Sequence, residues 1–129
     1  MKNKKGFTLI ELLVVISIIG VLSLMGLRLY LGQQDKAKDV MVKANAGTVQ
    51  TLIQAELADE DVTLGRAVDI ARAAGLHNPF NGVSMNTAGW FPVNAITPSQ
   101  IQITLSGGVF SIQGCGADGL FPNILTARK

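Results

Sequence analysis

The sequence has few of the residues that build catalytic or metal sites. Its 129 residues include one histidine, His77, and one cysteine, Cys115. No nucleophile beside a base, no glycine loop that could bind phosphate before a helix, and no cluster of metal ligands is visible in the sequence. The composition therefore predicts that the chain is not an enzyme, and we interpret His77 as an exposed loop residue.

The single cysteine also limits covalent crosslinks. Cys115 cannot close a disulfide within the chain, and it has no second cysteine for a redox or zinc pattern. We interpret it as a small buried hydrophobic residue, with an intermolecular disulfide and a free thiol as the alternatives.

The chain also lacks a positive field that could attract nucleic acid. Its formal net charge is +2, but Lys2, Lys4 and Lys5 supply three of the 11 basic residues. Without Met1 to Gly6 the chain would carry eight Lys and Arg against nine Asp and Glu. Because binding to phosphates depends on a surplus of positive charge, the sequence gives no direct nucleic-acid signal.

Charge and proline are scarce in the first part of the chain. Phe7 to Leu31 includes only two charged side chains, Glu11 and Arg28, and no proline precedes Pro79. This segment accounts for much of the 48% hydrophobic content. The lysines in front of it are typical of an N-terminus held on the cytoplasmic side of a membrane.

The apolar run is long enough for a membrane anchor. Leu12 to Leu27 is uncharged over 16 residues, and Arg28 can reach the headgroups so that Leu31 lies at the interface. That length approaches the roughly 20 residues of a typical span. Because no A-x-A-like cleavage site of a secretory signal follows, we expect a transmembrane helix.

Three residues of this helix have more than one interpretation. Gly20 and Gly26 either let another helix approach closely or are merely tolerated. The carboxylate of Glu11 costs on the order of 2.5 kcal/mol or more within a membrane unless it is paired. Glu11 therefore either has a partner or lies solvated at the surface.

The start of the chain resembles the prepilin signature of type IV pilins and type II secretion pseudopilins. The resemblance lies in residues 4–15, KKGFTLIELLVV. They combine a basic leader, a glycine, a phenylalanine, a glutamate five residues into the processed chain and a long apolar run.

The resemblance implies a processing site and an assembly contact. A prepilin peptidase would cut between Gly6 and Phe7, and the new amino terminus of Phe7 would be methylated. The carboxylate of Glu11 would meet the amino terminus of a neighbouring subunit. A free α-amino group has a reference pKa near 8 and is largely charged at neutral pH, so this pairing is physically sound.

The resemblance also implies a function and partners. The chain would be a structural subunit of a type IV pilus, joined to identical or related pilin subunits in a helical filament. A membrane platform with its ATPase would move it from the bacterial inner membrane to the extracellular pilus. A pseudopilin of a secretion or DNA-uptake system and a monomeric membrane-tethered binding domain are the alternatives.

We predict one helix from about Phe7 to about Leu57, because the segment has no proline. At the place of Arg28 many pilins have a kinking proline. The implied organisation is a leader at residues 1–6, a transmembrane and polymerisation half of the helix at 7–32, and a soluble head at 33–129. In the head, helical spacing indicates a stripe of Val40, Met41, Ala44, Thr48, Leu52 and Ala55, and an i,i+4 charge pair of Asp39 with Lys43.

The remaining head sequence predicts a short helix and an antiparallel sheet. Thr63 is a helix cap and Gly75 a terminator, with a solvated acidic loop at Asp59 to Asp61 before them. Residues 77–82 read as turns, and Trp90 and Phe91 as sheet or core residues. Alternation over 101–105 and the separator Ser106-Gly107-Gly108 predict a hairpin with 109–112. The fold class is therefore α+β, a long helix on a small antiparallel sheet.

Glycine is frequent between Gly114 and Gly119, which predicts a loop. Its Gly-Ala-Asp-Gly portion resembles the calcium-binding loop of major type II pseudopilins. Asp118 is the candidate calcium ligand, although the remaining ligand pattern is not visible. No other cofactor is expected.

Overall fold

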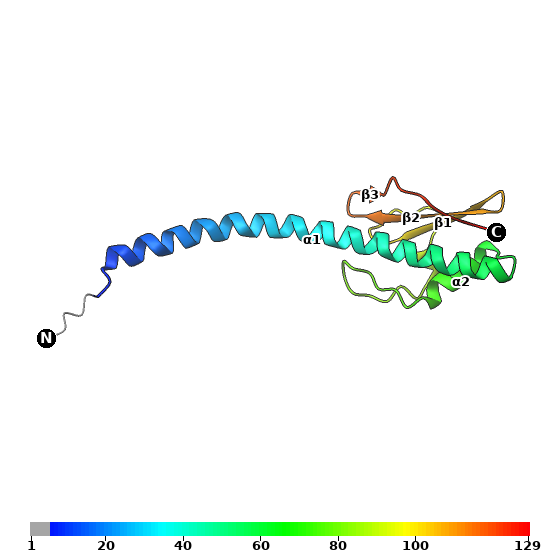
Figure 1. Cartoon of the computed structure of the whole chain (residues 1–129), viewed down its shortest axis with the longest axis horizontal. Coiled ribbons are helices and arrows are strands. Elements are labelled where there is room, and N and C mark those ends of the chain that lie inside the picture. Colours follow the sequence, from blue (N-terminus) through cyan, green and yellow to red (C-terminus); the bar gives the residue numbers. More distant parts are fainter. Residues whose placement is uncertain (1–5) are drawn as a thin grey trace. The chain divides into compact units, whose positions relative to one another are not determined.

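The computed structural model describes residues 6–129, so most of the expected leader, Met1 to Lys5, lies outside the described residues. The chain divides into two compact units, the first ending at Gln34 and the second running from Asp35 to Lys129. One helix, α1 (Leu9–Asp59), supplies residues to both units (Figure 1). The predicted long helix is confirmed, and it is helical through Arg28.

The second unit is built around one face of the C-terminal part of α1. The buried residues of α1 are Val42, Ala46, Val49, Ile53 and Leu57. They join one hydrophobic core with residues of the sheet and of the connecting loops, among them Ile101, Ile103, Phe110 and Ile112. The α+β arrangement expected from the sequence is confirmed.

The residues whose spacing indicated the helix lie in α1 but do not form its buried face. Val40 and Met41 are 62% and 56% exposed, and Leu52 is also exposed. Both stripes have helical spacing, so periodicity alone could not separate them. The core instead includes the face of α1 that carries Val42, Ala46, Val49, Ile53 and Leu57.

The sheet is antiparallel with β2 at its centre. Its strands are β1 (Ile101–Ser106), β2 (Val109–Gly116), β3 (Gly119–Leu120) and β4 (Leu125–Arg128). β2 pairs with each of the other three strands. Gly107 and Gly108, with φ of 57° and 80°, form the turn between β1 and β2, which is the backbone that a type I′ turn requires. The predicted hairpin is confirmed.

The glycine-rich segment is not the loop that the sequence predicted. Gly114, Cys115 and Gly116 belong to β2, and only Ala117 and Asp118 form the turn to β3. The glycines serve close packing, because a Cβ atom at Gly114 would lie 3.0 Å from Val42.

Gly116 is packed even more tightly than Gly114. A Cβ atom there would lie 2.6 Å from the ring of Phe121 and 2.7 Å from the Asp39 carboxylate. Glycine in this strand therefore marks a close approach of neighbouring groups to the backbone.

The short helix α2 (Leu64–Ala73) begins and ends as predicted. The Thr63 hydroxyl accepts a hydrogen bond from the Arg66 amide at 3.3 Å, and Gly75 has a φ of 68°. Glu60 and Asp61, which follow α1, are exposed as expected of a solvated acidic loop. A 3₁₀ turn, η1 (Ala88–Trp90), follows the turns of residues 77–84.

Three residues singled out from the sequence lie as expected in this part of the chain. Phe91 is buried in the core and Trp90 packs against it. His77 is exposed, which confirms its interpretation as a loop residue.

The packing of Gly116 can be tested by adding one methyl group. Gly116→Ala should lower the free energy of unfolding by about 1–3 kcal/mol, because Phe121 and Asp39 must move. Gly65→Ala in α2 is the control, since a Cβ atom there meets nothing within 4 Å. Thermal unfolding of the full chain in detergent measures the stability of both variants. Equal stability of Gly116→Ala and Gly65→Ala would contradict the packing argument.

Candidate functional site at the start of α1

The backbone before α1 is extended and accessible. Gly6, Phe7 and Thr8 have no helical structure, and the side chain of Phe7 is 92% exposed. The peptide bond between Gly6 and Phe7 therefore lies outside the helix. Because α1 begins at Leu9, only Thr8 separates the helix from Phe7.

Thr8 and Glu11 form a reciprocal cap that fixes where α1 begins. The backbone amide of Thr8 donates to Glu11 Oε2 at 2.9 Å, and the amide of Glu11 donates to Thr8 Oγ1 at 3.3 Å. This pattern is a capping box, in which two otherwise unpaired amide groups at a helix start are satisfied. The T-x-x-E spacing was visible in the sequence, but the interpretation of Glu11 considered only a neighbour or solvent.

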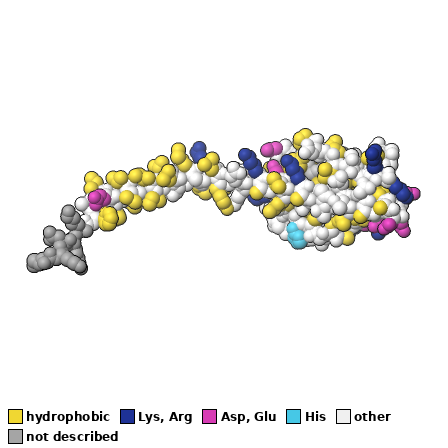
Figure 2. Space-filling view, viewed as in Figure 1, with side chains coloured by type: hydrophobic (Ala, Val, Ile, Leu, Met, Phe, Trp, Pro, Cys, Tyr) yellow, Lys and Arg dark blue, Asp and Glu magenta, His cyan; other side chains and the backbone are white. Residues whose placement is uncertain are grey.

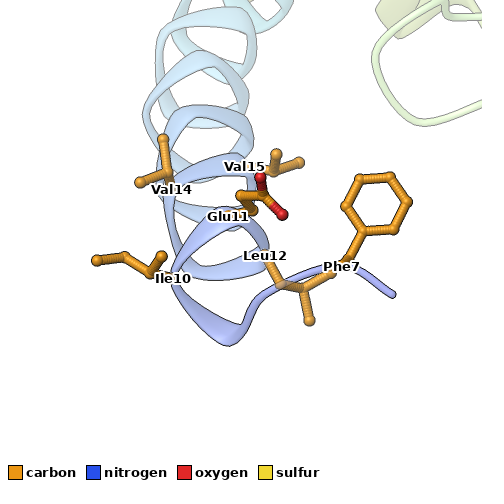
Figure 3. Close-up of a pocket in the computed structure, with 6 residues that line it drawn as sticks. All are labelled: Phe7, Ile10, Glu11, Leu12, Val14 and Val15. Atoms are coloured by element: carbon orange, nitrogen blue, oxygen red, sulfur yellow. The ribbon is translucent and has the colours of Figure 1, made fainter. Parts of the chain in front are cut away.

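The Glu11 carboxylate keeps one oxygen for a further partner. Within residues 6–129, only Oε2 accepts a hydrogen bond. In Figure 3 the carboxylate and the ring of Phe7 lie on the same side of the helix, whereas Ile10 and Val14 lie on the other. The helix N-terminus itself also favours a negative charge at this position, typically by 0.3–1 kcal/mol.

The first unit's part of α1 is apolar and uncovered. Its most apolar 18 residues have a mean hydropathy of 2.5 and none is buried, so this helix is long and apolar enough to cross a membrane. Figure 2 shows hydrophobic side chains along it. They include the exposed Leu9, Ile10, Leu12, Leu13, Val14, Val15, Ile16, Ile18, Ile19, Val21, Leu22, Leu24, Met25, Leu27, Leu29 and Leu31.

The hydroxyl groups in this stretch are satisfied by the helix itself. Ser17 donates to the Leu13 carbonyl and Ser23 to the Ile19 carbonyl, each at 2.7 Å. Since apolar surroundings offer no hydrogen-bond partners, internal bonding of these hydroxyls lowers the cost of placing the helix in lipid or among other helices.

The glycines of this region have no packing role among residues 6–129. A Cβ atom at Gly6, Gly20 or Gly26 would meet nothing within 4 Å. A requirement for glycine at any of these positions would therefore come from another molecule. For Gly20 and Gly26, close approach of a helix and simple tolerance both remain predictions.

The predicted ion pair of Asp39 with Lys43 is wrong, because each side chain contacts the hairpin of β2 and β3 or the segment after it. Asp39 Oδ1 accepts a hydrogen bond from the Ala117 amide at 3.0 Å. Lys43 Nζ lies 4.6 Å from the centroid of the Phe121 ring. Among the described residues no salt bridge joins the two.

The calcium prediction for Asp118 depends on further ligands close to its side chain. Asp118 is exposed in the two-residue turn between β2 and β3. In the part of the chain that the structure describes, no group of three or more His, Cys, Asp or Glu side chains could hold a metal ion. Calcium binding at Asp118 stays a prediction.

Cys115 is buried, which agrees with its interpretation as a small hydrophobic residue. Its side chain lies in β2 and the residue is 2% exposed. Burial raises the pKa of the thiol, and the negative charge of Asp39 raises the pKa further. Both effects disfavour the reactive thiolate.

These features at the start of α1 coincide with a known sequence family signature. A family model, the prokaryotic N-terminal methylation motif, matches residues 1–27. The chain therefore carries the type IV prepilin signature, and the resemblance stated from the sequence is confirmed.

Two curated relatives are fimbrial proteins. Fimbrial protein EcpB of Eikenella corrodens is 43% identical over 58 residues, which cover 45% of this chain and 36% of the relative. A probable minor fimbrial protein of Dichelobacter nodosus is 35% identical over 88 residues, 67% of this chain and 55% of the relative. The matched regions thus span about a third to just over half the length of these relatives. No solved structure matches the chain.

The capping box predicts different effects for its two members. Thr8→Ala removes the acceptor for the Glu11 amide and should speed hydrogen exchange of that amide by about 2- to 30-fold, as expected for a lost cap of 0.5–2 kcal/mol. Glu11→Gln should have little effect, because glutamine also completes a capping box. NMR-detected exchange of the full chain in detergent measures both. If hydrogen exchange of the residue 11 amide were equally faster in both variants, the capping box would be disproved.

Proposed function

We propose that the chain is a structural, non-catalytic subunit of a type IV pilus filament, made as a prepilin and assembled through α1. The observation that carries the proposal is the methylation motif of residues 1–27, which includes the start of an apolar, uncovered helix. The names of both relatives favour a pilus over a secretion pseudopilus. The identical or related subunits, the prepilin peptidase and the assembly platform with its ATPase are partners within this proposal.

The backbone at Gly6 and Phe7 supports the proposed cleavage and methylation. A peptidase needs an extended, accessible bond, and this bond precedes the helix. The capping box limits α1 to residues from Leu9 onward, which keeps the bond outside the helix. Cleavage would then leave Phe7 with a new α-amino group as the substrate for methylation.

The free oxygen of Glu11 supports the proposed assembly contact. An uncompensated carboxylate among apolar helices is costly, and a neighbouring α-amino group would lower that cost. The capping bond uses Oε2, so Oε1 could accept this second partner without loss of the cap. Glu11 would thus have two roles, one within its own helix and one between subunits.

The uncovered apolar surface of α1 must be buried both in the membrane-bound precursor and in the proposed filament. Lipid of the inner membrane would cover it in the precursor, and the helices of neighbouring subunits would cover it in the extracellular filament. Arg28 would lie near the headgroups in the membrane. In the filament it would need water or an acidic partner.

Glutamine at position 11 separates the two proposed roles. Glu11→Gln keeps the capping box but removes the charge, so we expect normal cleavage, normal membrane insertion and at least about tenfold fewer filaments. Electron microscopy of sheared surface filaments, with immunoblots of the membrane fraction, measures these outcomes. Ser17→Ala is the control on the same helix. Normal filament numbers for Glu11→Gln would disprove the contact, and a membrane-tethered monomer would give no filaments even for the unaltered chain.

The proposed cleavage depends on glycine at position 6. Gly6→Val should leave a full-length precursor in membranes, because a peptidase cleft that accepts glycine would exclude a branched side chain. The substitution should not disturb the fold, since a Cβ atom there meets nothing within 4 Å. An immunoblot for precursor and processed chain is the readout, with Gly32→Val as the control. Normal trimming of Gly6→Val would contradict the proposal.

A further inference from the structure

The outer edge of β4 faces side chains of α1 where a neighbouring strand would otherwise lie. On its other edge β4 pairs with β2, in the register Thr126 with Ser111 and Arg128 with Val109. Residues two apart along a strand direct their backbone groups to the same edge. The backbone groups of Thr126 and Arg128 that are not used by β2 therefore point to α1.

Two glutamines of α1 bind these backbone groups. Gln50 Nε2 donates to the Thr126 carbonyl at 2.9 Å. Gln54 Nε2 donates to the Arg128 carbonyl at 2.7 Å, and Gln54 Oε1 accepts from the Arg128 amide at 3.0 Å. The three bonds join parts of the chain that are more than 70 residues apart, so they depend on the tertiary fold.

Gln54 copies the chemistry of a strand residue. A carboxamide carries the same donor and acceptor as a peptide group. In an antiparallel sheet, one residue of the adjoining strand gives and receives a hydrogen bond with the residue opposite. Gln54 makes this same pair of bonds with Arg128.

The spacing of the two glutamines matches the spacing of the strand. Four residues along a helix rise about 6.0 Å, and two residues along an antiparallel strand rise about 6.8 Å. Gln50 can therefore bind Thr126 while Gln54 binds Arg128. The helix offers side-chain amides at the intervals at which a strand would offer backbone amides.

We propose that Gln50 and Gln54 form a pseudo-strand, which closes the β4 edge against the addition of a strand from a second copy of this chain. An unpaired edge is a template for another strand, and natural proteins protect such edges. The β4 strand of a second copy is the matching occupant, because two identical antiparallel edges can pair about a twofold axis. Without the glutamines, the Arg128 amide and the two carbonyls would be open to such pairing.

Hydrogen exchange tests whether the glutamines protect the edge. Gln54→Leu should speed exchange of the Arg128 amide by about tenfold, because two hydrogen bonds are lost. Gln54→Glu keeps an acceptor for that amide and should retain part of the protection. Gln33→Ala, an exposed glutamine in the first unit, is the matched control. Unchanged exchange of the Arg128 amide in Gln54→Leu, in the full chain in detergent, would overturn the proposal.

Crosslinking tests whether an opened edge accepts a second copy. Thr126→Cys places a reactive thiol on β4, whereas the native thiol of Cys115 is buried. A short bis-maleimide should give dimers when Thr126→Cys is combined with Gln50→Leu and Gln54→Leu, and few dimers when both glutamines are present. Equal dimer yield in the two backgrounds, or no dimer in either, would overturn the role of the pseudo-strand.

Discussion

The apolar side chains of the first unit have no cover within that unit, and much of the remaining structure depends on this constraint. Their surface is stable only in lipid or against other helices. The hydroxyls of Ser17 and Ser23 bond within the helix, which lowers the cost of such burial, whereas the charges of Glu11 and Arg28 still need partners. The second unit has a core of its own, built on the face of α1 that carries Val49 and Ile53.

Local signals predicted much of the fold. The cap at Thr63, the terminator at Gly75 and the turn at Gly107 and Gly108 act over a few residues, and the structure has each of them. The long helix followed from the absence of proline before Pro79. At the site, the motif around Gly6, Phe7 and Glu11 was recognised as a pattern, whereas the capping bond of Thr8 was overlooked although its spacing was visible.

The features that the sequence could not predict depend on contacts between distant segments. Which stripe of α1 is buried depends on where the sheet lies, and two stripes fit the same periodicity. Gly114 and Gly116 indicated a loop because glycine weakens strands, but the ring of Phe121 needs their bare backbone. Gln50 and Gln54 look like ordinary polar residues of an exposed helix until β4 is placed beside them.

The capping bond of Glu11 has a consequence for the thermodynamics of association. A free glutamate side chain loses roughly 1.5–2 kcal/mol of conformational entropy when it is immobilised. In this chain the bond to the Thr8 amide restricts the rotamers of Glu11 when α1 forms. The carboxylate is thus preorganised, and a cation that reaches its second oxygen meets a group whose orientation is already set.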